Sequence, residues 1–459
     1  MEKSTLIFLL LLLSAIAFHW GRKRALRMAG GDLRRLHSLP SYYGYYCALW
    51  CGVPTLLLLF VWLCFENPII AHLLAESLPP ELVSGSPERL SLLVNDIRNV
   101  ANNPGASGVD PAIRQAADYY LRLEKISNLL LSGLGICLAL GGAAFAHQRI
   151  AGTYRARNQV ERAVTVFLIG CATVAIFTTI GIVLSVLFES IRFFQKVPVT
   201  EFLFGLHWSP QMAIRPDQVG SSGAFGAVPL ITGTMLISAV AMLVAVPIGL
   251  LSAIYLSEYA GPGFRSLAKP LLEILAGIPT VVYGFFAALI VAPFVRDLGT
   301  GLGLEVSSES ALAAGLVMGI MIIPFVSSLS DDFINAVPQA LRDGAYALGA
   351  TQSETIRQVV IPAALPGIVG GILLAISRAI GETMIVVMAA GLSANLTANP
   401  LQAVTTVTTQ IVTLLIGDQE FDSPKTLAAF ALGLILFLMT LVLNIIALHI
   451  VRRYREQYE

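Results

Sequence analysis

Nine runs of apolar residues recur along the chain, separated by polar or charged segments. They lie at 5–20, 45–65, 127–147, 163–188, 228–256, 268–296, 309–329, 363–391 and 425–450. Most reach the roughly 20 residues that a helix needs to cross the hydrocarbon core of a bilayer. A soluble core cannot absorb so many runs of this length, so the pattern predicts nine transmembrane helices in an all-α, polytopic membrane protein.

Charge supports this prediction and orients the helices. Only 13% of the residues are charged and the formal net charge is zero, but basic residues cluster beside particular apolar runs. Such clusters mark the cytoplasmic side, and their position at helix ends argues against nucleic-acid binding. The clusters are Arg22, Lys23, Arg24, Arg27, Arg34 and Arg35; Arg149, Arg155, Arg157 and Arg162; and Arg452, Arg453 and Arg455.

One alternating path places all three clusters inside the cell. It puts the N-terminus outside, the 330–362 segment inside, and the loops 66–126, 189–227, 297–308 and 392–424 outside. The first run resembles a signal peptide, but its basic cluster follows the apolar stretch instead of preceding it. We therefore predict a retained helix.

The chain divides near residue 155. Residues 1–155 hold three of the predicted spans around the 66–126 loop, and residues 156–459 hold six. Within the loop, two amphipathic helices are predicted at Pro87–Val100 and Pro111–Lys125, separated by turn-forming residues.

The 330–362 segment is polar but patterned. Phe333, Ile334, Val337, Ala340, Leu341, Ala345 and Leu348 follow helical spacing, and Ile356, Val359 and Val360 continue it. Gly349 between them is suited to end a helix in the left-handed conformation. Thr351 or Ser353 is then suited to cap a second helix, with Glu354 in its first turn. Two short helices at an angle would form a compact docking surface. An ordinary solvated loop is the alternative.

This segment resembles the loop of ABC importer permeases written E-A-A, three residues, G, nine residues, I-x-L-P. Asp343, Gly344, Ala345 and Gly349 match its first part, and Val359 to Pro362, including Ile361, match its end. Asp replaces Glu, Gly the first Ala, Val the first Ile, and Ile the Leu. Four further phrases make the chain similar to the C-subunit permease of the phosphate-specific transport (Pst) system. These are FGAVP (225–229), AIYLSEY (253–259), LAGIPTVVYG (275–284) and SRAIGET (377–383).

The resemblance covers about 156–459 and implies a type I ABC importer permease core of six helices. The three extra N-terminal spans correspond to a longer variant. It further implies a bacterial inner-membrane location and four partners besides the bilayer lipid: a homologous second permease, two copies of an ATPase and a periplasmic phosphate-binding protein. The 330–362 segment would dock on the ATPase.

Two charges interrupt the eighth apolar run. Arg378 lies near the middle of the bilayer, where an unpaired Arg costs at least about 2.5–3.5 kcal/mol, and Glu382 is four residues further on. On one helix these two side chains share a face. A stripe of small residues beside them, Gly367, Gly371, Ala375, Ala379 and Thr383, predicts close approach of another helix.

We expect Arg378 to attract an oxyanion through its planar fork of donors, with Glu382 and Thr383 on the same pathway. Glu382 would compete for the Arg and accept a hydrogen bond from protonated phosphate. An intrahelical ion pair that only locks the helix is the alternative. Outer residues expected to meet the binding protein are Phe202, Phe204, His207, Trp208, Asn395 and Asn399.

Other chemistry is not indicated. The histidines are scattered without ligand spacing, and no G-x-x-x-x-G-K-[ST] motif occurs, so we expect no metal site, no cofactor and no catalytic residues here. ATP would bind to a partner subunit. The five cysteines all lie in apolar segments and are expected to be buried and inert. Permeases for sulfate or molybdate, a membrane sensor or scaffold, and a secondary transporter are the rival functions.

Overall fold

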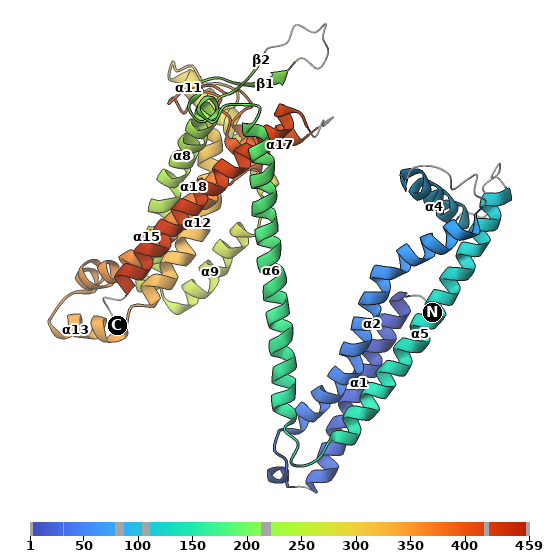
Figure 1. Ribbon diagram of the computed structural model, residues 1–459. Coiled ribbons are helices and arrows are strands. Elements are labelled where there is room, and N and C mark those ends of the chain that lie inside the picture. Colours follow the sequence, from blue (N-terminus) through green and yellow to red (C-terminus); the bar gives the residue numbers. More distant parts are fainter. Residues whose placement is uncertain are drawn as a thin grey trace. The chain divides into compact units, whose positions relative to one another are not determined.

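The computed structural model describes residues 3–30, 32–78, 87–102, 111–212, 222–416 and 422–455. The chain forms two compact units, Met1–Phe177 and Thr178–Glu459, and the boundary falls inside one long helix, α6 (Ala156–Phe194). Within the described residues, nine helices are long and apolar enough to cross a membrane (Figure 1). The predicted number of spans and the all-α fold class are thus confirmed. The functional division at residue 155 stays a prediction.

In the first unit, three long helices pack together, with a short helix near one end. They are α1 (Lys3–Ala29), α2 (Pro40–Ser77), α4 (Pro87–Asn102) and α5 (Pro111–Arg149), and a 3-10 turn (Leu33–Arg35) follows α1. Glycines allow the close packing, since a Cβ on Gly142 would lie 2.0 Å from the Trp50 carbonyl oxygen. The α4 prediction is confirmed. The second amphipathic helix is not separate, because it continues into the third span as α5. The predicted turn between them lies mostly at 103–110, outside the described residues.

A polar cluster ties the start of α1 to α2. The Lys3 ammonium pairs with the buried Glu66 carboxylate, which also accepts a hydrogen bond from Ser127 Oγ at 2.6 Å. Trp62 Nε1 in turn donates to Ser127 Oγ at 2.9 Å. Glu66 stands at the start of the predicted 66–126 loop, so the first helix begins at the same end of the unit as that loop. The predicted path requires this, because it places both the N-terminus and the 66–126 loop outside the cell.

The cysteine prediction is partly wrong. Cys47 and Cys51 are buried in the α1–α2–α5 core, whereas the side chains of Cys64, Cys137 and Cys171 are exposed. Apolar surroundings in the sequence do not distinguish a core position from one that faces outward on a membrane helix.

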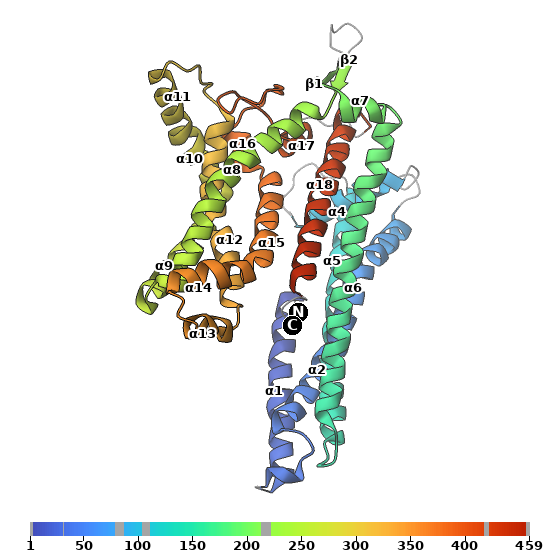
Figure 2. The ribbon, with the colours of Figure 1, turned by 90° about the vertical axis from the view of Figure 1, so that its left-hand side faces the viewer.

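The second unit follows the distal half of α6. A short helix, α7 (Val199–Phe204), precedes a two-stranded antiparallel hairpin of β1 (Trp208–Met212) and β2 (Ser222–Phe225), in which Trp208 is paired with Phe225. The helices after the hairpin are α8 (Val228–Ile254), α9 (Pro262–Ala276), α10 (Thr280–Phe286), α11 (Ala292–Gly301), α12 (Ala311–Asn335), α13 (Gln339–Ala347), α14 (Gln352–Thr355), α15 (Ile361–Ile380), α16 (Met384–Ala389), α17 (Val407–Leu415) and α18 (Pro424–Arg455). Figure 2 shows α8, α12 and α15 side by side.

Helix α12 is the centre of this unit, and α8 packs along it. Small residues bring the two backbones together: a Cβ on Gly319 would lie 2.9 Å from the Ala241 carbonyl oxygen, and one on Gly315 would lie 2.6 Å from Val240 Cγ1. Ile322 and Met318 fill the same core, fully buried. This packing of small residues is how membrane helices gain van der Waals contact without a hydrophobic drive.

Two predicted spans are divided in the structure. The run at 268–296 is broken at Gly277–Pro279, so that α9 is separate from α10, which continues through a π-helical turn into α11. Proline lacks the backbone N–H that a continuing helix uses, which explains the break. The run at 363–391 is also divided: α15 ends at Ile380, and α16 begins at Met384.

Candidate functional site

The 330–362 segment contains one separate short helix, not two. Phe333 and Ile334 belong to the end of α12, and α13 starts only after Pro338. The second predicted helix is the beginning of a longer one: α14, a π-helical turn (Ile356–Val360) and α15 form a single span, Gln352–Ile380. The π-helical turn accommodates Pro362, which has no N–H to donate and would crowd a regular turn.

The turn and the helix cap in this segment were predicted correctly. Gly349 has a φ of +88°, and the Ala350 N–H bonds to the Ala345 carbonyl oxygen at 3.1 Å, which closes α13 in a Schellman-type turn. Thr351 caps α14 by accepting from the Glu354 N–H, while the Glu354 carboxylate accepts from the Thr351 N–H at 2.8 Å. This is a complete capping box.

Helix α13 presents its side chains outward. None of its residues is buried, and Asp343 and Gly344 are exposed whereas Ala345 is half-buried. Leu348, directly after the helix, is 91% exposed. Gly349 and Pro362 are also exposed, and Ile361 is half-buried. Leu341 and Tyr346 of the same segment are exposed as well, and a group of exposed apolar side chains, unlike a single one, is typical of a surface that binds another protein.

An ion pair anchors α13 to the π-helical turn (Tyr255–Tyr259) that continues α8. Arg342 Nη2 lies 3.0 Å from Glu258 Oε1, with the two side chains only 14% and 8% exposed, and Nη2 also donates to the Ile334 carbonyl oxygen at 2.8 Å. Gln352 Nε2 donates to the Glu258 carbonyl oxygen at 2.7 Å. Sequence reasoning missed this pair, although Glu258 lies in the AIYLSEY phrase, because nothing in the spacing indicates which basic residue meets it.

The small-residue stripe of α15 meets α12, as predicted for four of its five members. A Cβ on Gly367 would lie 2.2 Å from Phe333 Cδ1, and one on Gly371 would lie 3.2 Å from Leu329 Cβ. Ala375 and Ala379 are buried in the same direction. Thr383 is not part of the stripe, since α15 ends before it.

Arg378 is exposed near the distal end of α15. Its guanidinium carbon lies 5.6 Å from the centroid of the Phe325 ring of α12. Its guanidinium has no hydrogen bond and no ion pair among the described residues. A cation over an aromatic face is only partly compensated, so Arg378 keeps its donors available to an anion.

Glu382 does not share a helical face with Arg378, and the prediction that it does is wrong. Gly381 ends α15, and Glu382 lies in the break before α16, where its carboxylate accepts from the Met384 N–H at 3.2 Å. Its carbonyl oxygen accepts from Thr408 Oγ1 at 2.8 Å. Thr383 Oγ1 donates to the Gly381 carbonyl oxygen at 3.3 Å. Both residues thus shape the break beside Arg378.

The outer residues expected to contact another protein differ in exposure. Phe204, His207, Asn395 and Asn399 are exposed, but Phe202 and Trp208 are buried. Phe202 packs against Phe193, and Trp208 Nε1 donates to Gln410 Oε1 at 3.0 Å. Aromatic residues in a loop sequence can fill a local core, and these two do.

Two family profiles match the chain. Residues 7–178 match a family described as phosphate ATP-binding cassette transporter, and residues 245–456 match the binding-protein-dependent transport system inner membrane component family. The first match covers nearly the same residues as the first structural unit.

Three similar proteins are all named as transporter permeases. A probable ABC transporter permease, YqgH of Bacillus subtilis (strain 168), is 30% identical over 59% of this chain and 84% of its own length. The phosphate transport system permease PstC of Mesorhizobium japonicum is 35% identical over 50% and 74%, respectively. A probable PstC of Methanocaldococcus jannaschii is 30% identical over 60% and 90%.

Among solved structures, a bacterial ABC transporter involved in alginate import is similar over 65% of this chain and 99% of its own. The TM-score is 0.44 and the identity 16%.

Proposed function

Because this chain belongs to the PstC-type ABC transporter permeases, we propose that it is the membrane subunit through which an ATP-driven importer carries inorganic phosphate. It would act in a bacterial inner membrane and hydrolyse no ATP itself. A homologous second permease, an ATPase dimer and a periplasmic phosphate-binding protein would complete the machine, and no cofactor would be held by this chain.

The observation that carries the proposal is the environment of Arg378. In a span of mean hydropathy 2.4, a guanidinium without an anionic partner in the described residues is costly. A membrane span carries such a charge where the charge binds an anion. Its planar donors fit the oxygens of phosphate, which a lysine would meet only as a point charge.

The exposed α13 supports the ATP-driven part of the proposal. Its outward Leu348 and the rigid turn at Gly349 suit a docking contact with the ATPase, and the Glu258–Arg342 pair fixes α13 to α8. A movement of the ATPase would therefore be passed to α8 and α15 together. A secondary transporter has no need of this surface.

Phosphate uptake with an altered Arg378 tests the function. Radiolabelled phosphate uptake would be measured in cells that lack their own high-affinity system and receive this chain with its partner subunits. We expect Arg378→Gln to abolish uptake while the complex still assembles, and Arg452→Gln, an exposed charge at the end of α18, to leave uptake unchanged. Uptake of sulfate or molybdate instead of phosphate by the parent would identify another cargo.

A further inference from the structure

A groove runs between α2 and the first turns of α6, within the first unit. Its volume is about 770 Å³, in the range of sites that hold small molecules. The lining residues of α2 follow each other at intervals of three and four and so form one helical face: Tyr46, Leu49, Trp50, Val53, Pro54 and Leu57. Most lining residues of α6 have the same spacing: Gln159, Arg162, Ala163, Val166 and Phe167. Two continuous helical faces thus form its walls.

The cytoplasmic end of the groove is held in place by packing and hydrogen bonds. Ala156 and Val160, on a neighbouring face of α6, are buried in the α1–α2–α5 core. The Arg157 N–H donates to Ser38 Oγ at 3.2 Å, and just before α6 the Tyr154 carbonyl oxygen accepts from Tyr43 Oη at 3.0 Å. The start of α6 is therefore fixed against α2, and the space beside it is a feature of the first unit.

The length of the groove matches one leaflet of a bilayer. From Tyr46 to Leu57 it extends about 17 Å along α2, at 1.5 Å per residue, and half of a hydrocarbon core is about 15 Å thick. The basic cluster from Arg149 to Arg162 places this half in the cytoplasmic leaflet. A transmembrane helix packed on α2 would need a contact surface along the whole span, whereas a lipid chain ends near the bilayer midplane.

The groove is polar at its cytoplasmic end and apolar further in. Gln159 and Arg162 line it near the start of α6, and the lining residues further along both helices are apolar. On the other wall stands Trp50, a residue type common at membrane–water interfaces. Its ring lies 4.9 Å from that of Phe145, and the Arg149 guanidinium carbon lies 4.4 Å from the Phe145 centroid. A second cation is therefore close to the same end.

Arg162 has its charge available. The residue is exposed, and its guanidinium has no hydrogen bond and no ion pair among the described residues. The adjacent acid, Glu161, is paired with Arg157, whose Nε lies 2.6 Å from its carboxylate. The cytoplasmic end of the groove therefore presents a guanidinium that an anion can bind.

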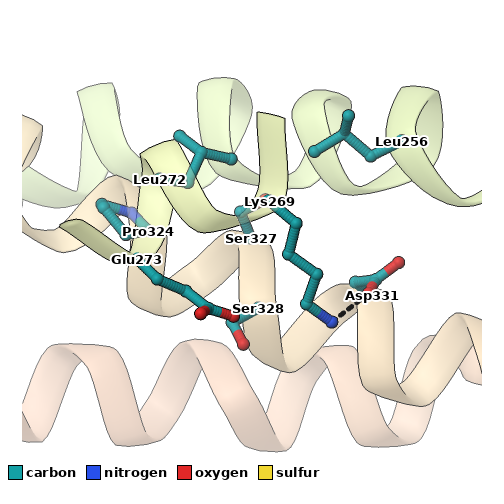
Figure 3. Close-up of a pocket in the computed structure, with 8 residues that line it drawn as sticks. All are labelled: Leu256, Lys269, Leu272, Glu273, Pro324, Ser327, Ser328 and Asp331. Carbon is teal, nitrogen blue, oxygen red and sulfur yellow. Dashed lines mark hydrogen bonds and ion pairs between the residues drawn. The ribbon is translucent and has the colours of Figure 1, made fainter. Parts of the chain in front are cut away.

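The cations of α9 in the second unit show the opposite arrangement. Arg265 and Lys269 contact the buried Asp331 of α12 at 3.0 and 2.9 Å. Figure 3 shows the Lys269 contact, and the gap beside it has a volume of about 20 Å³, enough for roughly one water molecule. Such a contact holds two helices together and leaves no space for a ligand. The groove at Arg162 has both the space and the unpaired charge.

We propose that this groove binds a phospholipid with an anionic headgroup from the cytoplasmic leaflet. Arg162 would donate to the phosphate oxygens through its planar fork, and one acyl chain would fill the apolar space between Trp50 and Phe167. Basic pockets between membrane helices on the cytoplasmic side are suited to such headgroups. The site lies wholly in the first unit and is independent of the proposed cargo.

Lipid binding to the purified complex tests the role of Arg162. Native mass spectrometry would follow titration with phosphatidylglycerol and, separately, with phosphatidylcholine of the same acyl chains. We expect one phosphatidylglycerol per copy of this chain to bind about tenfold more tightly than phosphatidylcholine, and Arg162→Gln to abolish this preference, since a charge-assisted hydrogen bond is lost. Arg155→Gln is the control, because Arg155 is exposed but does not line the groove. Equal losses in both variants would indicate general charge attraction and refute the site.

Photolabelling tests where the acyl chain lies. Phosphatidylglycerol with a diazirine in its acyl chain would be irradiated in phosphatidylcholine vesicles that contain the complex. We expect label within 49–57 and 163–167, displaced by excess unlabelled phosphatidylglycerol. Val166→Trp should fill the groove and remove this label, whereas Leu168→Trp, on the opposite face of α6, should keep it. Both side chains are exposed, 64% and 60%, so that neither change disturbs the core. Label spread along α6 that unlabelled lipid does not displace would indicate surrounding lipid only and overturn the proposal.

A protein in the groove would give a different result. If the isolated chain is labelled within 49–57 and 163–167 but the assembled complex is not, a helix of another subunit fills the groove and the lipid site is refuted. Phosphate uptake by the same complex keeps the two proposals apart. A complex that imports phosphate without label in the groove refutes only the lipid site, and a labelled complex that imports no phosphate refutes only the proposed cargo.

Discussion

Arg342 of α13 and Glu258, in the π-helical turn (Tyr255–Tyr259) that continues α8, are paired across 3.0 Å in a largely buried position. A buried pair of this kind is costly to break from one side, because the remaining charge stays unpaired, at about 3–5 kcal/mol. The pair therefore makes the position of α13 depend on α8.

We expect Arg342→Gln and Glu258→Gln each to lower the thermal stability of the purified complex and to uncouple ATP hydrolysis from uptake. The double variant Glu258→Arg with Arg342→Glu should restore part of the thermal stability and part of the coupling between ATP hydrolysis and uptake. Thermal unfolding and phosphate uptake per ATP hydrolysed are the measurements. If each single variant behaves like the parent, the pair does not fix α13.

Gly349 is required for its backbone conformation. At a φ of +88° an L side chain is strained, so Gly349→Ala should cost about 1–2 kcal/mol and reduce uptake. Gly344→Ala is the matched control: it lies within α13, and an added Cβ there meets nothing within 4 Å. We expect Gly344→Ala to leave thermal stability equal or slightly higher. Equal effects of both substitutions would contradict this account.

Gly367 allows α15 to reach α12. Gly367→Val would place atoms inside the Phe333 ring and should destabilise the protein by about 1–3 kcal/mol through overpacking. Gly433→Val, in α18, is the control, because nothing lies within 4 Å of its added Cβ. Thermal unfolding in detergent would show the difference, and a stable Gly367→Val protein would show that α15 can move off α12 at little cost.

Leu348 is expected to act between proteins and not within this chain. Leu348→Ser should leave the thermal stability of the isolated permease unchanged, since the side chain is 91% exposed. Binding of the ATPase should weaken by about tenfold or more, because burying a leucine side chain contributes about 1.5–3 kcal/mol. Co-purification of the permease with the ATPase measures this binding. Undiminished binding would move the contact elsewhere on α13.

Glu382 was predicted to accept a hydrogen bond from protonated phosphate, which sulfate at neutral pH cannot offer, and this stays a prediction. Glu382→Gln keeps an oxygen for the Met384 N–H, so the break between α15 and α16 should persist. The substitution should weaken the hydrogen bond that this side chain accepts from protonated phosphate, because the acceptor loses its charge. Competition of sulfate against labelled phosphate uptake is the measurement. Unchanged discrimination in the variant would restrict Glu382 to a structural role.

Several features could be predicted from the sequence because they depend on neighbouring residues. The number of membrane-spanning helices, the turn at Gly349 and the cap at Thr351 follow from local sequence, and the described residues have all three. The stripe from Gly367 to Ala379 could also be predicted, since close approach needs small side chains at regular spacing.

What the sequence did not reveal depends on partners far along the chain. Asp331 meets Arg265 and Lys269 only because α9 lies across α12, and Glu258 meets Arg342 only because α13 turns back toward α8. The end of α15 at Ile380 was missed for another reason. The apolar run predicted at 363–391 continues past Gly381, although this glycine caps the helix.

The uninterrupted span from Gln352 to Ile380 has a mechanical consequence. It begins beside the turn at Gly349 and carries Arg378 near its other end, roughly 40 Å away at 1.5 Å per residue. The π-helical turn at Ile356–Val360 and Pro366 are the points at which this helix can bend. Under the proposed function, a tilt imposed at Gln352 would reach the guanidinium through this one helix, and its two bend points would set how much of the tilt arrives, without a relay of side chains.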